Sequence, residues 1–326
     1  MSQFRLMTWN VENLFDVGDD DGPKTQAQFA AKIESLRAVI DAQRPHVLTL
    51  QEVGSESALA KLQAALEHKL PHRAVAEPDE RGIRVAIISR RVLHDPAEIR
   101  PFPSGLLPVQ VGDDPPGPDG PRMINQMGRG ALQVTVRANN RDVHIITAHL
   151  KSKLLTFPDG RFTPHTEDER TRYASYALYR RASEATTLRS NLDALLAGEG
   201  REMAVVLTGD MNDEVDAATT LILNGPPGSE IGSVGFDHQP DLGDGDRMWN
   251  TASLIPEARR FSRLYRGRME LIDHIFVSNF LVTGTRITDV TTVTAAAGMP
   301  SIEDDPDARQ GKPGSDHAAV IATFDF

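Results

Sequence analysis

The sequence contains no cysteine among its 326 residues. This absence excludes a disulfide framework, a zinc site built on thiolates and a cysteine nucleophile. Any metal ion would therefore have to bind to carboxylate, amide or imidazole groups. The chain also has no apolar run that approaches the ~18 residues required by a membrane-spanning helix.

The N-terminus has no feature of a secretory leader. Met1-Ser2-Gln3-Phe4-Arg5 carries neither a basic cluster nor an apolar stretch, and it leads directly into a strand-like segment. We therefore expect a cytoplasmic protein without membrane attachment. Nothing in the sequence indicates an obligate protein partner.

The sequence also lacks an excess of positive charge. It has 35 Lys and Arg residues against 46 Asp and Glu residues, a formal net charge of −11. This balance argues against non-specific coating of nucleic acid. It does not exclude a phosphate ester as substrate, because a bound divalent cation can reverse the local field.

Apolar residues alternate along the chain between the spacing of strands and the spacing of helices. Strands are expected at 3–9, 47–50, 83–89, 131–137, 142–148, 204–207, 261–266, 271–277, 285–293 and 318–325. Helices are expected at 26–42, around Leu59, Leu62, Leu66 and Leu70, at about 168–197, and from about 214. The long helix would turn Leu178, Ala185, Leu188, Leu192 and Leu195 inward, and Asn139-Asn140 would form a turn between two strands.

Three segments, 101–121, 224–246 and 298–315, are rich in Gly, Pro and Asp. Such segments are typical of loops. Strand-like sequence resumes on both sides of each one, so none is expected to be a linker between domains. We expect a single domain over residues 1–326.

Polar residues recur where the expected strands end, which is where a sheet scaffold can bring distant parts of the chain together. They occur in Trp9-Asn10-Val11, Gln51-Glu52, His149-Leu150, Gly209-Asp210-Met211-Asn212, Asp273 and Ser315-Asp316-His317. Each has an ordinary structural explanation when taken alone: Asn10 as a turn residue, Glu52 as a helix-start carboxylate, and His149 as a core histidine. Asp210, Asn212 and Asp316 could equally be turn or cap residues.

The set as a whole points to chemistry on a phosphate ester. Hydrolysis of such an ester requires a hard cation on oxygen ligands and a carboxylate that activates water. It also requires amide and imidazolium donors for the developing charge, and carboxylates that orient each imidazole. Two Asn, one Glu, three Asp and two His supply these groups together.

These motifs, in this order, resemble the endonuclease/exonuclease/phosphatase superfamily, whose fold is that of deoxyribonuclease I. The resemblance extends from residue 4 to about 325. It implies an α+β fold, a four-layer α/β/β/α sandwich of two packed mixed sheets flanked by helices. It also implies Mg²⁺ as cofactor, with Mn²⁺ as an alternative.

The resemblance further implies a role for each matching residue. Glu52 corresponds to the main Mg²⁺ ligand, with Asn10 and Asp316 near the metal, and Asp210 to the carboxylate that activates water. Asn212 and His317 correspond to phosphate contacts, with His317 also in acid–base work. His149 corresponds to the second imidazole, which Asp273 would hold.

Basic residues outside these motifs carry weaker signals. Lys151, directly after His149-Leu150, is placed to reach a flanking phosphate or to lie in a solvated loop. Arg129, in Gly128-Arg129-Gly130, could bind phosphate, although a turn arginine is the simpler interpretation. The arginines at 259–268 could form a strip for a polyanion, but runs of charge are usually solvated.

The sequence therefore predicts a metal-dependent hydrolase of phosphate esters, first of all a phosphodiesterase of the nuclease type acting on DNA or RNA. Residues Asn10 to Phe15 resemble the first motif of generic bacterial-type members of the superfamily. The alternatives are a phosphatase or phosphodiesterase for lipid or small-molecule headgroups, and a non-catalytic binding protein of the same fold.

Overall fold

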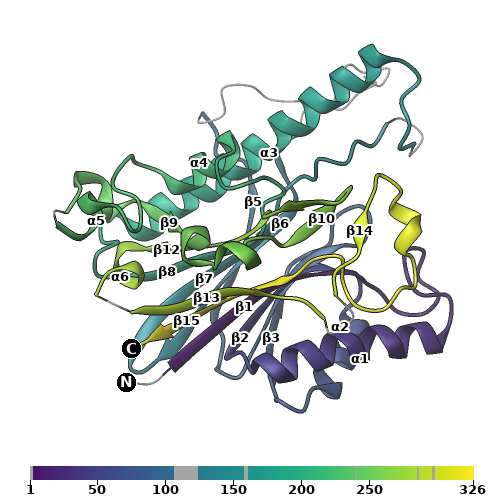
Figure 1. The fold of residues 1–326 in the computed structure, drawn as a ribbon, viewed down its shortest axis with the longest axis horizontal. Coiled ribbons are helices and arrows are strands. Elements are labelled where there is room, and N and C mark those ends of the chain that lie inside the picture. The colour runs from purple at the N-terminus through teal and green to yellow at the C-terminus, as the bar shows by residue number, and fades with distance from the viewer. Residues whose placement is uncertain (1–2, 106–123, 158–160, 239, 285, 296–297) are drawn as a thin grey trace.

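Two six-stranded sheets form the centre of the computed structural model, which describes residues 3–105, 124–157, 161–238, 240–284, 286–295 and 298–326 (Figure 1). The strands of the first sheet are β1 (Gln3–Leu14), β2 (Val47–Val53), β3 (His72–Val75), β4 (Arg84–Ser89), β13 (Ile287–Val293) and β15 (Ala319–Asp325). Those of the second are β5 (His94–Pro101), β6 (Gln126–Ala138), β7 (Arg141–His149), β8 (Ala204–Asp210), β9 (Met248–Asn250) and β12 (Asp273–Ser278). A small third sheet joins β10 (Arg263–Tyr265), β11 (Arg268–Glu270) and β14 (Ser301–Ile302).

Both large sheets are mixed. The first has the order β13-β15-β1-β2-β4-β3, in which β1 runs parallel to β2 and antiparallel to β15. The second has the order β5-β6-β7-β8-β12-β9, in which β8 runs parallel to β7 and antiparallel to β12. The strands that carry the polar motifs are thus neighbours at the centre of each sheet.

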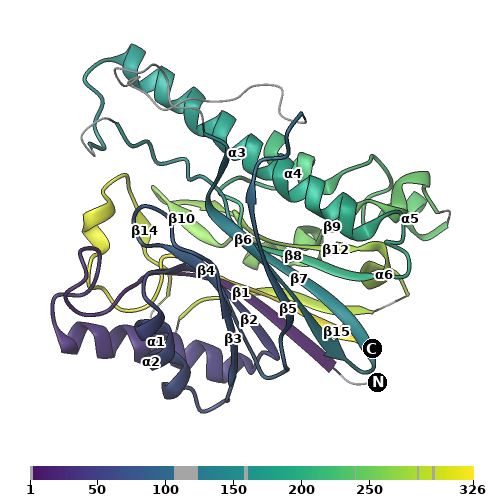
Figure 2. The ribbon, with the colours of Figure 1, turned by 180° about the vertical axis from the view of Figure 1, so that it is seen from behind.

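Helices cover the outer face of each sheet (Figures 1 and 2). The helices α1 (Gln26–Gln43) and α2 (Glu56–Ala65) pack on the first sheet, and α3 (Glu167–Leu196) and α4 (Ala218–Asn224) on the second. One apolar cluster fills the space between the sheets, and two others lie under the helices. This arrangement confirms the expected α/β/β/α sandwich. Among the described helices, none combines the length and the apolar composition that a bilayer-spanning helix needs.

Local sequence signals fix the ends of the long helices close to their expected positions. Thr25 caps α1 by accepting a hydrogen bond from the backbone of Gln28, whose side chain completes a capping box. Thr166 caps α3 by accepting one from the backbone of Glu169. Asn139 and Asn140 have φ values of 46° and 65°, as a tight turn between β6 and β7 requires.

The short strands β3, β5, β9, β11 and β14 were not expected from the sequence. The strand β5 is largely exposed along its length and therefore lacks the apolar alternation that reveals a strand. The helix expected from about 214 begins at Ala218. The segment 224–246, expected to be a loop, contains the short helix α5 (Val234–His238) and a 3₁₀ turn. Most of the loop at 101–121 lies outside the described residues.

One expectation about α3 is wrong. Ala185, Leu188 and Leu192 are buried, but Leu178 has 46% of its surface exposed and Leu195 is half-buried. The N-terminal half of α3, where Leu178 lies, extends beyond the edge of the sheets (Figure 1). Tyr173 and Ala177 are the buried apolar residues of this half, and the ring of Tyr173 lies 5.2 Å from that of Phe157, so the helix is covered there on another side than that of Leu178. Periodicity cannot show this change of the covered side.

A buried polar layer connects the two sheets next to the strand ends that carry the motifs. The Nε2 of Gln51 donates to the hydroxyls of Thr8 (3.1 Å) and Thr147 (3.0 Å). The hydroxyls of Thr49 and Thr208 lie 3.0 Å apart. Because buried hydrogen bonds are directional, this layer fixes how the sheets face one another at the site.

Candidate active site

Strand register brings three of the expected residues side by side in the second sheet. His149 of β7 and Asp273 of β12 are both register partners of Asp210 on β8. The close approach of β7 and β8 depends on Gly209, whose φ is +135°. A Cβ at Gly209 would lie 1.9 Å from the carbonyl oxygen of Ala148, so the motif requires glycine there.

The first sheet contributes Asn10 and Glu52. The Nδ2 of Asn10 donates to Glu52 Oε1 (3.1 Å) and to Asp210 Oδ2 (3.0 Å), so one amide connects carboxylates of the two sheets. Glu52 Oε2 also accepts from the backbone N–H of Asn13 (3.0 Å). The expected meeting of distant motifs at one point is therefore present.

The first and last motifs of the chain hold one another in place. The indole N–H of Trp9 donates to the carbonyl of His317 (2.9 Å). The hydroxyl of Ser315 donates to the carbonyl of Asn10 (2.6 Å) and accepts from the backbone N–H of His317 (3.0 Å). These contacts place the imidazole of His317 over the ends of β8 and β12.

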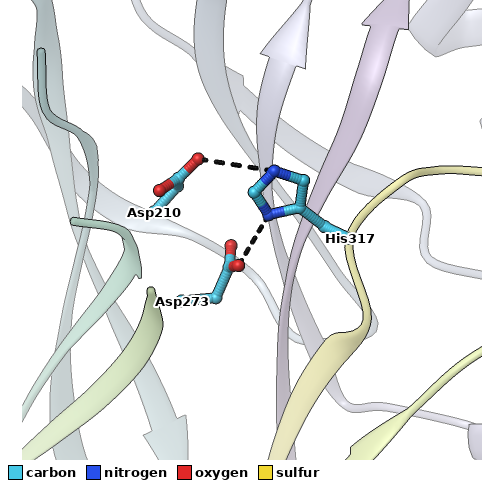
Figure 3. Close-up of side chains that lie close together, drawn as sticks. All are labelled: Asp210, Asp273 and His317. Carbon is cyan, nitrogen blue, oxygen red and sulfur yellow. Dashed lines mark hydrogen bonds and ion pairs between the residues drawn. The ribbon is translucent and has the colours of Figure 1, made fainter. Parts of the chain in front are cut away.

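His317 lies between two carboxylates, as Figure 3 shows. Its Nδ1 is 2.6 Å from Asp273 Oδ2, and its Nε2 is 3.9 Å from Asp210 Oδ2. The interpretation that Asp273 holds His149 is thus wrong, because Asp273 binds His317 instead. Burial opposes a charge on the ring, but Asp273, followed by Asp316 and Asp210, outweighs it and raises the pKa of His317 to about 10. His317 is an imidazolium at neutral pH.

Asp210 is a buried carboxylate with a raised pKa. Burial is the largest cause and the nearby charge of Asp273 adds to it, while His317 and the hydrogen bond from Asn10 act in the opposite direction. A carboxylate with a raised pKa is a stronger base than an exposed one. Asp210 is also held rigidly, because its Oδ1 accepts from the backbone N–H of Asn212 (2.9 Å).

His149 is neutral. Burial, followed by the charge of Arg129, lowers its pKa well below the ordinary value. Nη1 of Arg129 is 2.7 Å from Nε2 of His149, and Asp210 Oδ2 is 3.4 Å from the same nitrogen. A guanidinium can only donate, so Nε2 accepts and the proton sits on Nδ1. His149 therefore forms no charged pair with Asp210, and Arg129 is the group that orients it.

Arg129 and Lys151 both lie at the site. Arg129 is part of β6 and not of a turn, and its Nε donates to Asp79 Oδ2 (3.2 Å). Lys151 follows β7, and its ammonium group donates to the carbonyls of Ser152 and Leu154. Burial, followed by Arg129, lowers the pKa of Lys151 to about 8. Both side chains line a cavity of about 730 Å³ that begins at His149.

Asp316 lies in a second charged group beside the first. Its backbone N–H donates to Glu12 Oε2 (3.1 Å), and Glu12 also pairs with Lys32 (3.7 Å) and Arg309 (2.6 Å). Burial, followed by the charge of Asp316, raises the pKa of Glu12. Periodicity did not single out Glu12, Lys32 or Arg309, because their spacing in the sequence shows no pattern.

Four non-glycine residues with positive φ lie at or beside the motifs of the site. Glu12, Asn13, Glu52 and Asn212 all have φ values between 51° and 60°, which only a few per cent of non-glycine residues adopt. Such conformations persist where the surrounding contacts over-determine them, and they are common at functional sites. The Nδ2 of Asn212 is held by the carbonyl of Leu150 (3.0 Å), which fixes the direction of its amide.

Two sets of residues could hold a cation. Asp210, Asp273 and His317 have ligand atoms within 4.8 Å of one another. His317, however, is an imidazolium bound to Asp273, and a protonated ring offers no lone pair at that nitrogen. The carboxylate of Glu52, which is only partly buried and lies beside the amide of Asn10, suits Mg²⁺ better, because Mg²⁺ prefers oxygen ligands. The donor set therefore fits a hard divalent ion.

His274 is a buried residue near the site that sequence reasoning missed. Its Nε2 donates to the carbonyl of Asp213 (2.9 Å), and its Nδ1 accepts from Nδ2 of Asn250 (3.1 Å). Burial lowers its pKa to about 4, although the Asp213 carbonyl and Asp210 act in the opposite direction. The folded state therefore binds this proton less readily than the unfolded state does.

We expect this histidine to make the protein sensitive to acid. Its contribution to the free energy of unfolding is complete above pH 6.5 and is lost as the pH falls toward 4, by about 3 kcal/mol. Denaturant titrations across this interval should show a smaller loss for His274→Gln than for the wild type. His94→Gln, at an exposed position, is the matched control. An equal loss in wild type and His274→Gln would contradict the assignment.

Comparison with known proteins adds three findings. The sequence model described as the endonuclease/exonuclease/phosphatase family matches residues 7–317 of this chain. No curated protein matches it. Many solved structures do, at low sequence identity.

Three of these structures illustrate the shared fold. One is a functionally unknown conserved protein from Enterococcus faecalis, with 15% identity, 98% of each chain covered and a TM-score of 0.54. Another is truncated TDP2 from Caenorhabditis elegans, with 14% identity, 99% of this chain and 97% of that chain covered, and a TM-score of 0.55. The third is the human Nocturnin catalytic domain with bound sulfate anion, with 15% identity, 99% and 94% coverage, and a TM-score of 0.53. At such identities the likeness shows the fold alone.

Proposed function

The chain belongs to the endonuclease/exonuclease/phosphatase family, and on this premise we propose that it is a divalent-metal-dependent phosphodiesterase, in the first place a nuclease. The observation that carries the proposal is the continuous set of contacts Glu52–Asn10–Asp210–His317–Asp273. It combines a carboxylate base, an imidazolium and an oxygen-rich place for a cation within one buried cluster. Members of the family generally hydrolyse phosphodiesters.

The proposed base is Asp210. It takes a proton from a water molecule, whose oxygen then attacks phosphorus while the bond to the leaving oxygen breaks. The charge that develops on the phosphoryl oxygens is stabilised by the imidazolium of His317 and by the amide of Asn212. Asp273 keeps His317 protonated and oriented through the 2.6 Å hydrogen bond. The leaving oxygen receives its proton from solvent or from His317.

Glu52, together with Asn10 and Asp316, would hold Mg²⁺ or Mn²⁺, which leaves the carboxylate of Asp210 free to act as the base. When bound, such an ion supplies Lewis-acid polarisation of the phosphoryl group and neutralises charge on the leaving oxygen. Arg129, which donates to Nε2 of His149, would supply a fixed positive charge to the substrate phosphate on the His149 side of Asp210. Residues 1–326 would act as a single domain, since both sheets contribute to the site.

The substrate class is tested by a panel of phosphate esters. We expect the purified protein to hydrolyse bis(p-nitrophenyl) phosphate and single-stranded or duplex nucleic acid in the presence of Mg²⁺ or Mn²⁺. EDTA should abolish the rate, and an excess of the metal should restore it. Inositol phosphates and sphingomyelin are the other arms of the panel. Faster turnover of these headgroups than of nucleic acid would favour the alternative, an enzyme for small-molecule or lipid phosphates. Binding without turnover of any ester would favour a non-catalytic protein.

A further inference from the structure

We propose that the cavity beside His149 binds a single-stranded stretch of the substrate chain that flanks the scissile phosphate. This inference rests on the proposed function and names its substrate class more closely. The cavity has a volume of about 730 Å³, within the usual range of ligand sites, and His149, the register partner of Asp210, forms part of its lining. Its walls come from the segment between β3 and β4, from β5 and β6, from the segment after β7 and from α3.

The cavity carries more positive than negative groups, in contrast to the rest of the protein. Five cations line it: Arg81, Arg100, Arg129, Lys151 and Arg180. The acidic residues that line it are Asp79, Glu80 and Glu184. Four of the cations are paired with carboxylates: Arg81 with Asp21, Arg100 with Glu98, Arg129 with Asp79 and Arg180 with Glu184. A guanidinium has five N–H donors, so each arginine can keep its carboxylate and still donate to a phosphate inside the cavity.

The glycines around Arg129 make this arrangement of arginines possible. A Cβ at Gly128 would lie 2.6 Å from Nη2 of Arg180, and a Cβ at Gly130 would lie 3.0 Å from Cγ of Arg100. The two glycines therefore leave room against β6 for the side chains of Arg180, from α3, and Arg100, from β5. Arg100, Arg129 and Arg180 line the same cavity, and we call them the arginine wall.

Aromatic rings occupy another part of the cavity. Phe162, Tyr173 and Tyr176 line it, and the rings of Tyr173 and Tyr176 are 6.4 Å apart in an edge arrangement. Phe162 is 41% exposed, although a large apolar side chain is more stable when buried. The base faces of single-stranded nucleic acid stack on such rings, at about 1–3 kcal/mol per base.

Cations and aromatic rings together distinguish the ligand. A ligand that offers only phosphate groups would use the arginines and leave the aromatic rings without a partner. A ligand with an apolar headgroup would use the rings and leave the arginines without one. A duplex keeps its base faces stacked on neighbouring bases, so they are not available to rings inside a cavity. A single strand offers both a phosphate and an unstacked base at each step, which matches this lining.

The test compares two substrates in each variant: bis(p-nitrophenyl) phosphate, which has no flanking nucleotide, and a short single-stranded oligonucleotide. The quantity measured is the ratio of kcat/KM for the oligonucleotide to kcat/KM for the small diester. Arg180→Gln and Tyr176→Ala should each lower this ratio by roughly tenfold. Gly128→Ala should also lower this ratio, because the added methyl group displaces Arg180. Arg172→Gln, on an exposed face of the same helix and outside the cavity, should leave it unchanged.

Fluorescence anisotropy with a labelled oligonucleotide provides a second measurement that does not depend on turnover. In Arg180→Gln the slope of log K against log salt concentration should fall by about 0.7. An unchanged ratio and an unchanged slope would overturn the inference, and so would equal losses on the single strand and on the same sequence as a duplex. A wild type that cleaves neither substrate but shows these binding differences would contradict the proposed function and leave the inference standing.

Discussion

Asp210→Asn is expected to lower kcat for a phosphodiester by roughly a thousandfold. The substitution removes the carboxylate that would accept the proton of the attacking water, and it keeps the size of the side chain. It also removes one of two neighbouring buried negative charges, because Asp273 raises the pKa of Asp210 from close by. We therefore expect a Tm no lower than that of the wild type, since burial of like charges destabilises the folded state.

The loss of rate and the retained stability must be measured together. Initial rates with bis(p-nitrophenyl) phosphate at saturating Mg²⁺ give kcat, and thermal unfolding gives Tm. Asp216→Asn is the matched control, because it makes the same chemical change at an exposed position six residues along the chain. Activity of Asp210→Asn equal to that of the wild type would remove Asp210 from its proposed role.

His317 and Asp273 are expected to act as one unit. His317→Ala should lower kcat by roughly a thousandfold, and Asp273→Asn by about a hundredfold, because Asp273 acts only through the ring that it holds. The double variant should be no slower than His317→Ala alone, since the function of Asp273 is already lost when the ring is absent. A double variant whose loss equals the product of the two single losses would show that the residues act independently.

The ion pair between His317 and Asp273 should also make the free energy of unfolding depend on pH. The pKa of His317 in the folded protein, about 10, lies above its ordinary value of 6.5. Its stabilisation is therefore complete below pH 6.5 and is lost as the pH rises toward 10, by about 3–5 kcal/mol. Denaturant titrations of wild type and His317→Ala over this interval separate the contribution of this group from that of others. His94→Ala serves as the exposed control. Parallel pH profiles of His317→Ala and wild type would contradict the charged state assigned to the ring.

The long elements of the fold were predictable from the sequence because their signals are local. The caps at Thr25 and Thr166 and the turn at Asn139-Asn140 satisfy backbone groups within a few residues. The edge strand β5 and the three-residue strand β9 were not predictable, because their hydrogen-bond partners lie far away in the sequence. The exposure of Leu178 shows the same limit, since the tertiary structure decides which side of a helix is covered.

The residues of the site were predictable as a set, and their pairing was not. Glu52, His149, Asp210 and Asp273 lie at or next to strand ends, and Asn10 lies within β1 where its register with β2 shifts. The apolar segment before each residue makes this position visible in the sequence. The partner of Asp273 was misassigned, because two histidines were available and only the register of β8 and β12, with the contacts from Trp9 and Ser315, decides between them. Sequence order gives no information on which ring reaches which carboxylate.

The sequence by itself determined which chemical groups are available: oxygen and imidazole ligands, no thiols, and acidic and amide residues at the ends of strands. Only the tertiary structure decided their protonation, because burial and neighbouring charges raise the pKa of His317 and lower that of His149. Only the tertiary structure also revealed the arginine wall, since Arg100, Arg129 and Arg180 come from three elements that meet around two glycines. The physical reason is that electrostatic energy depends on distances in space, and the covalent order of a chain does not fix those distances.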